Sequence, residues 1–192
     1  IGIVFDDLFE NFNKLKNTLS SHITNYQIAH VKVDGLDLVC PANDHGHPSG
    51  AISTPHIAQN AVELFKTLRQ TKPDIWIEAT CFGWNPSPWW LFYVNCVLGT
   101  HGDDAPWGVV PSPVYRYSLT TARDYFNLQG AIYSKIPIAA QQVFGIIHQS
   151  NEPFIEDGIN AVMRGHNFIP LYFNPKYMNE QRWRTLAELM NW

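Results

Sequence analysis

Short apolar segments alternate along this chain with longer segments in which apolar residues recur every three or four positions. Runs of five to nine residues rich in Val, Ile, Phe and Tyr, separated by polar or Gly/Pro-containing stretches, are typical of strands. Near-continuous apolar runs favour a parallel sheet that is covered by helices. The strands predicted in this way are residues 1–5, 28–33, 75–79, 92–98, 132–140 and 167–173.

The segments between these strands have the period of amphipathic helices. The clearest one starts at Thr54-Pro55, with Thr54 as the N-cap and Pro55 at the first helical position. Its apolar stripe includes Ile57 and Leu64, and Lys72-Pro73 ends it. The helices predicted in this way are residues 8–19, 54–72, 118–127, 141–148, 154–164 and 179–190.

Six strand–helix units predict an α/β fold with a parallel sheet. Two architectures fit this order, part of a (β/α)8 TIM-type barrel and an open doubly wound sheet. No G-x-G-x-x-G and no P-loop follows any strand, which removes the usual signature of a nucleotide-binding doubly wound fold. We therefore predict a barrel. A complete barrel takes about 250 residues, so these 192 residues would hold six of its eight units.

The composition narrows the classes of partner. Charged residues make up 16% of the chain and aromatic residues 14%. Few charges and many rings suit a carbohydrate site, where ring faces stack on C–H surfaces. The formal net charge of −4 argues against a nucleic-acid partner, which needs a basic surface. No apolar run approaches the roughly 20 residues of a membrane span.

The first residues of the chain and its cysteines bear on whether the chain is complete and on its cellular compartment. The chain opens at Ile1 on an apolar strand, with no initiator Met and no signal-peptide pattern. We therefore expect a piece of a larger protein, with the remainder of the same barrel as its partner and a homo-oligomer as a second option. Cys40, Cys81 and Cys96 show no C-x-x-C spacing. They leave the compartment open, with secretion or the periplasm among the alternatives.

Asp34 is the strongest candidate for chemistry. It closes a strand in which Val31 and Val33 alternate with Lys32 and Asp34, so the two charged residues share one face. A carboxylate at the carboxyl end of a barrel strand is typical of catalysis. The alternative is an Asp that caps a helix or takes part in a structural salt bridge.

Further acids follow other predicted strands. Glu78 lies in the strand 75–79, and Asp103 and Asp104 come shortly after the strand 92–98. Facing carboxylates at the mouth of a barrel are what glycoside cleavage needs, one to attack the anomeric carbon and one to protonate the leaving oxygen. Lys32 would keep the Asp34 carboxylate ionised and donate to a sugar hydroxyl. Glu78 has a second interpretation as a buried structural acid.

Three motifs in order resemble those of one enzyme clan. Val31-Lys32-Val33-Asp34-Gly35 resembles the K-x-D-G strand of the α-galactosidase (melibiase) clan, glycoside hydrolase families 27 and 36. Cys81-Phe82-Gly83-Trp84, followed by Pro88-Trp89-Trp90, looks like the Cys-containing substrate loop after the next strand. Gly102-Asp103-Asp104 stands where the clan keeps its acid/base Asp.

The resemblance implies that residues 1–192 form the C-terminal portion of a glycoside hydrolase barrel, covering its strands 3 to 8. It implies a retaining enzyme for terminal α-linked sugars, with Asp34 as nucleophile and Asp103 or Asp104 as acid/base, Asp103 being preferred because it follows Gly102. Carbohydrate is the expected partner, and no cofactor or metal is needed. The residues expected to bind substrate are Lys32, Asp6, Asp7, Asp37, Cys81, Trp84, Trp107 and Arg116.

Three other functions stay open at this point. A transglycosylase of the raffinose-synthase kind would share the nucleophile and differ only in the acceptor. A metal-dependent hydrolase would use Asp44, His45 and His47, because His-x-His is a known ligand spacing. A sugar-binding barrel without catalytic activity would keep the aromatic residues and lose the chemistry.

Overall fold

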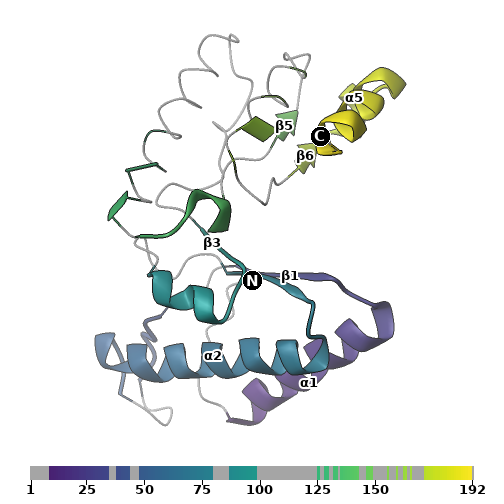
Figure 1. Cartoon of the computed structure of the whole chain (residues 1–192). Helices are drawn as coiled ribbons and strands as arrows, with labels where there is room; N and C mark the ends of the chain where they lie inside the picture. The colour runs from purple at the N-terminus through teal and green to yellow at the C-terminus, as the bar shows by residue number, and fades with distance from the viewer. Residues whose placement is uncertain are drawn as a thin grey trace. The chain divides into compact units, whose positions relative to one another are not determined.

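A computed structural model describes most of the first half of the chain and parts of the second (Figure 1). The chain divides into two units, Ile1–Val97 and Leu98–Trp192, and each is described by itself. The described residues are 9–34, 38–43, 48–79, 87–98, 125, 128–129, 132–133, 135–142, 146–148, 155, 159, 162–163, 165 and 171–191.

Parallel strands form the centre of the first unit. β1 (His30–Val33) pairs with β2 (Trp76–Ala79), and β2 pairs with β3 (Cys96–Leu98). The predicted strands 28–33 and 75–79 are therefore confirmed. The predicted strand 92–98 is too long, since a 3-10 helix, η2 (Pro88–Phe92), occupies its start. Pro88 favours this turn, and the Ser87 side chain caps it by accepting from the Trp89 N–H.

Two helices belong to the same unit, α1 (Phe9–Tyr26) and α2 (Thr54–Thr71), and both lie on one side of the sheet (Figure 1). Both predicted helices are confirmed, but the N-cap of α2 is Ser53 instead of Thr54. A 3-10 helix, η1 (Ala51–Ser53), runs directly into α2, so Thr54 already has helical dihedral angles. Ser53 instead fastens the preceding loop, because its buried hydroxyl accepts from the Cys40 N–H and donates to the Gly50 carbonyl.

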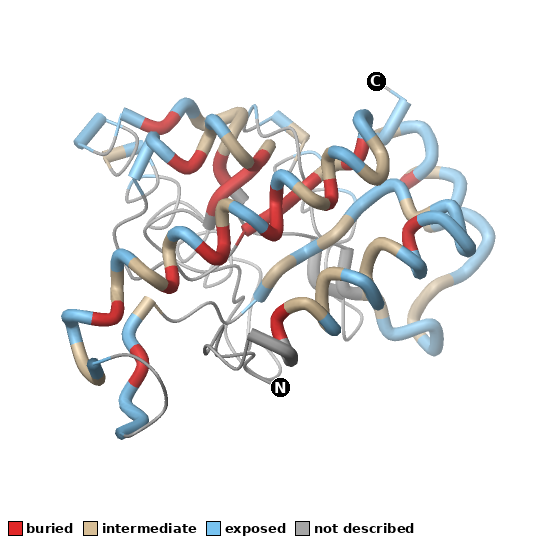
Figure 2. Tube along the Cα trace, turned by 90° about the horizontal axis from the view of Figure 1, so that it is seen from below, coloured by how far each residue is buried: buried red, intermediate tan, exposed pale blue. Residues whose placement is uncertain are grey.

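The core of this unit lies between α2 and the sheet. The buried residues of α2 recur along one side of the helix, as the red segments in Figure 2 show. The strands contribute alternate positions, because neighbouring residues of a strand point to opposite faces. The fully buried apolar residues are Ile57, Ala61, Phe65, Leu68, Ile75, Ile77, Ala79 and Val97.

The helices are tied to each other and to the sheet by polar contacts. Lys16 of α1 forms an ion pair with Glu63 of α2. At the other end of α2, the Arg69 guanidinium donates to the Ile75 carbonyl at 3.0 Å and to Asn95 Oδ1 at 2.6 Å. The same Asn95 oxygen accepts from the Ile77 N–H at 2.9 Å, which joins the start of β3 to β2.

The second unit holds shorter elements. β5 (Ile146–His148) and β6 (Leu171–Phe173) form a parallel pair, and α5 (Glu180–Met190) follows β6. Asn179 caps α5 by accepting from the Arg182 N–H. The predicted helix 179–190 is confirmed, and β6 lies within the predicted strand 167–173.

Two of the elements predicted for residues 132–148 differ from the structure. The strand predicted at 132–140 is wrong, because 132–133 are helical and η3 (Ile138–Ala140) is a 3-10 helix. Pro137, which has no N–H to give to a ladder, precedes η3 as its N-cap. The helix predicted at 141–148 is also wrong, since β4 (Gln141–Gln142) and β5 lie there. Tyr125 and Ile155 are helical within the predicted helices 118–127 and 154–164.

The predicted (β/α)8 barrel, with its strands 3 to 8, is wrong for the part of the chain that the structure describes. A barrel closes one ladder around a common axis, so that every strand has a neighbour on both sides. Here the first unit has a small sheet that starts at β1, and β5 and β6 pair with each other in a sheet of their own. The segment that should have supplied another barrel strand, 132–140, is helical at 132–133 and 138–140 and contains no strand in its described residues.

The contacts of Asn95 give the first testable prediction. Asn95→Ala removes the acceptor of two hydrogen bonds, so we expect the free energy of unfolding to fall by about 1–3 kcal/mol. Asn95→Asp keeps the acceptor oxygen beside Arg69 and should lose less. Hydrogen exchange of peptides covering β2 and β3 measures the change. Asn25→Ala on the exposed face of α1 is the control, and an equal loss in both alanine variants would contradict the prediction.

Candidate functional site

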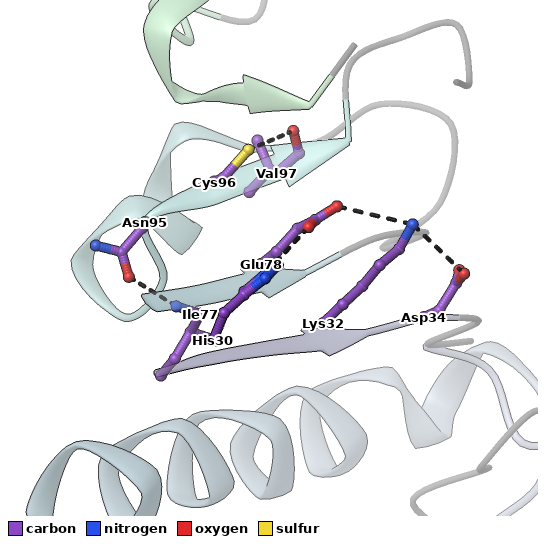
Figure 3. Close-up of polar contacts among 8 residues, drawn as sticks. All are labelled: His30, Lys32, Asp34, Ile77, Glu78, Asn95, Cys96 and Val97. Atoms are coloured by element: carbon purple, nitrogen blue, oxygen red, sulfur yellow. Dashed lines mark hydrogen bonds and ion pairs between the residues drawn. The ribbon is translucent and has the colours of Figure 1, made fainter. Parts of the chain in front are cut away.

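The polar side chains of the sheet gather on the face away from α2. His30 and Lys32 of β1 share this face with Glu78 of β2 and Cys96 of β3 (Figure 3). The parallel register explains the grouping, because Lys32 lies directly beside Glu78, and Glu78 directly beside Cys96. Residues that are paired across strands point to the same face.

Glu78 is the centre of this group. Its side chain is 0% exposed, and each of its carboxylate oxygens faces a nitrogen of β1 (Figure 3). Oε2 is 3.3 Å from His30 Nε2, and Oε1 is 3.8 Å from Lys32 Nζ. A buried carboxylate is costly unless charges and dipoles compensate it, and Lys32 and His30 contribute to that compensation for Glu78.

Asp34 stands at the outer end of the group. It follows the last residue of β1, at the carboxyl edge of the parallel sheet, and its side chain is 64% exposed. Its Oδ2 lies 3.8 Å from Lys32 Nζ, so one ammonium group serves the buried Glu78 and the exposed Asp34. In parallel α/β sheets, ligands bind outside the carboxyl ends of the strands. Asp34 therefore offers an anionic oxygen at the edge where a ligand would arrive.

His30 is the neutral member of the group. Burial lowers the pKa of its imidazole from the usual 6.5, and the positive charge of Lys32 lowers it further. Both effects oppose the attraction of the Glu78 carboxylate for a protonated ring. His30 is therefore uncharged at neutral pH, and its contact with Glu78 is made by the dipole of the ring.

Cys96 is a buried thiol of low reactivity. Burial raises its pKa to about 12, and the negative charge of Glu78 adds to the rise, while Lys32 opposes it. Its Sγ contacts the Val97 carbonyl at 3.8 Å. Because the thiolate is the reactive form of cysteine, Cys96 is unsuited to nucleophilic chemistry.

Of the residues predicted to form the site, the structure brings Lys32 and Asp34 together. Glu78, considered from the sequence as a buried structural acid, joins them. His30 and Cys96 were not predicted, although the alternation of β1 puts His30 on the face of Lys32. The predicted residues that lie outside the described part of the chain are Asp6, Asp7, Asp37, Cys81, Trp84, Asp103, Asp104, Trp107 and Arg116.

The other possibilities raised by the sequence are placed as follows. Asp44, His45 and His47 also lie outside the described residues, and the described ones contain no group of three His, Cys, Asp or Glu that could hold a metal ion. Trp90 is buried against Phe65 of α2, with ring centroids 6.3 Å apart, so it is a core residue. Over the described ranges, no helix is both long and apolar enough to cross a membrane.

Comparison with known proteins adds no relative. No protein-family model matches the chain, and neither the curated proteins nor the solved structures include a significant match.

Among the described residues of this group, Asp34 has the most exposed side chain, and Glu78 is fully buried. Asp34 can act as a nucleophile or bind a cation or a hydroxyl, because it is exposed and ionisable. Glu78 can do none of these to a ligand in solvent, since its side chain is fully buried. Lys32, with a side chain 30% exposed, can donate to a ligand that contacts Asp34.

The lowered pKa of His30 predicts a pH dependence of stability. The unfolded chain binds a proton at His30 near pH 6.5, whereas the folded chain does so only at lower pH. The stabilisation is therefore fully present above pH 6.5 and is lost as the pH falls below it. His30→Gln should flatten this loss in urea unfolding between pH 7.5 and 5.5. His22→Gln, at an exposed position of α1, is the control, and equal slopes in all three proteins would refute the effect.

The raised pKa of Cys96 predicts protection from alkylation. With a pKa of about 12, only about one thiol in 10⁴ is ionised at pH 8. Iodoacetamide should therefore leave Cys96 unmodified in the native protein and modify it in concentrated urea. Peptide mass spectrometry measures both states. Modification of native Cys96 at the rate of a free thiol would contradict the assignment.

Proposed function

We propose that this chain carries the nucleophile of a retaining glycoside hydrolase that acts on terminal α-linked sugars, with Asp34 in that role. The observation that carries the proposal is an exposed carboxylate at the carboxyl edge of a parallel sheet, with a lysine ammonium group at 3.8 Å. The resemblance of residues 31–35 to the K-x-D-G strand of the α-galactosidase clan supports the same role.

The proposed chemistry is a double displacement. An Asp34 oxygen attacks the anomeric carbon, the glycosidic bond breaks, and the leaving oxygen takes a proton from the acid/base residue. The resulting ester between the sugar and Asp34 is then hydrolysed by water, which gives a proton back to the acid/base. Asp103 or Asp104 is proposed for that second role on the resemblance alone.

Lys32 has a role that suits this chemistry. A nucleophilic carboxylate must be ionised, and a cation nearby favours the charged form. The same ammonium group can donate to a hydroxyl of the bound sugar. Glu78 is not a candidate for the acid/base, because a fully buried carboxyl cannot reach a leaving group that departs into water.

The nucleophile can be tested by trapping it. A 2-deoxy-2-fluoro or 5-fluoro glycosyl fluoride of α configuration should form a stable ester on Asp34, which peptide mass spectrometry detects as a mass increase on the peptide that contains it. Asp34→Ala should lose several powers of ten in turnover, because no covalent intermediate can form. Asp74→Ala, in the exposed turn before β2, is the matched control and should keep its activity.

Two results would contradict the proposal. One is a label on a residue other than Asp34, and the other is near-normal turnover of Asp34→Ala on the best substrate of the wild-type protein. Trapping does not separate hydrolase from transglycosylase, since both form the same ester. Product analysis with and without an added sugar acceptor separates them.

A further inference from the structure

Glu78 is fully buried, and yet it is tied to the exposed Asp34 through one shared partner. Lys32 Nζ is 3.8 Å from Glu78 Oε1 and 3.8 Å from Asp34 Oδ2, as the two dashed lines from Lys32 in Figure 3 show. The Lys32 ammonium therefore lies between a carboxylate inside the sheet face and a carboxylate in solvent.

The two carboxylates are not equivalent in what they do to Lys32. Asp34 is exposed, so water screens its attraction for the ammonium, and an exposed pair of this kind contributes little. Glu78 is fully buried, where the attraction is stronger and the carboxylate has to be compensated. Glu78 therefore attracts the Lys32 side chain more strongly than Asp34 does.

The rest of the face reinforces this arrangement. The titratable groups that the described strands place here are His30, Lys32 and Asp34 with β1, Glu78 on β2 and Cys96 on β3. His30 is neutral and Cys96 keeps its proton, so neither competes with Glu78 for Lys32. Glu78 and Lys32 form an ion pair within the described part of the face, and Asp34 meets that pair from outside.

We propose that Glu78 is a positioning residue, which holds the Lys32 ammonium beside Asp34 and offsets its positive charge there. This rests on the proposed function of Asp34 as nucleophile. With Glu78 in place, Lys32 can orient the Asp34 carboxylate, while the buried Glu78 carboxylate offsets much of the positive charge of Lys32. Without Glu78, the whole charge of Lys32 acts on Asp34, which makes the carboxylate a weaker nucleophile and easier to keep ionised.

The first arm of the test needs no glycosidase activity. Reductive methylation requires the lysine amine to meet the reagent in solvent, so a side chain that is held between two carboxylates reacts more slowly than one that moves freely. In Glu78→Gln, Lys32 should be methylated several-fold faster than in the wild-type chain, as measured by peptide mass spectrometry. Glu63→Gln, which removes the partner of Lys16 between α1 and α2, is the matched control and should leave Lys32 unchanged.

The second arm reads the effect on Asp34. In Glu78→Gln, the acid limb of the kcat/KM profile should move to lower pH, and kcat/KM at its plateau should fall several-fold. In Lys32→Met, the acid limb should move the other way. The double variant should lose less than the two single variants together, because Glu78 acts through Lys32. A role limited to folding would change the amount of active protein and leave the limb in place.

The outcomes separate this inference from the proposed function. An unchanged Lys32 methylation rate in Glu78→Gln overturns the positioning role, whatever trapping shows for Asp34. Faster methylation with an unmoved acid limb also overturns it, in an enzyme whose trapped residue is Asp34. If trapping fails, the proposed function fails, and the methylation arm still decides whether Glu78 holds Lys32. If Glu78→Gln does not fold, Glu78→Asp keeps the charge and moves it away from Lys32. Lys32 should then still be methylated faster than in the wild-type chain, and an unchanged rate overturns the positioning role.

Discussion

The alternation of β2 is the constraint on which the first unit depends. Ile77 and Ala79 must point toward α2, where a fully buried apolar stripe receives them, so Glu78 between them must point to the other face. Glu78 is itself fully buried. Its charge therefore cannot be left to water, and the fold has to supply compensation from a neighbouring strand.

The compensation comes from β1 and sets the chemistry of the whole face. Lys32 and His30 stand beside the two oxygens of Glu78, and burial keeps His30 neutral and the Cys96 thiol protonated. Lys32 thus pairs with the buried anion. Asp34 has the most exposed side chain of the described members of this group, and it lies one residue beyond the end of β1.

The sequence predicted what depends on local patterns. The alternation of apolar and charged residues in β1 assigns its two faces correctly, with Val31 and Val33 on one face and Lys32 and Asp34 on the other. The apolar stripe of α2 correctly predicts the buried side of that helix. The same local pattern fails where a neighbour competes. Thr54 is a good N-cap residue, but η1 runs straight into α2 and moves the cap to Ser53. Pro88 turns the start of a strand-like aromatic run into η2.

The larger errors concern how strands join. The order of six strand-like segments is compatible with a barrel. However, the sequence of a strand does not reveal which other strand it pairs with. The sequence therefore did not predict that β5 and β6 form a separate sheet. It also did not predict the helical residues at 132–133 and 138–140, where a strand was expected. The contact of His30 with Glu78 was missed for the same reason, since it depends on the register between β1 and β2.

That register is selected at two levels. A slip of one residue would point either Glu78 or Lys32 toward the apolar core beside α2. Burying a charged side chain there without a partner is too costly. A slip of two residues keeps both faces, and charge opposes it. It would set Asp34 beside Glu78, with two carboxylates in repulsion, or move Lys32 beyond the reach of Glu78. The apolar alternation thus fixes the faces, and the Lys32–Glu78 pair favours the observed register, in which Asp34 lies at the carboxyl edge of the sheet.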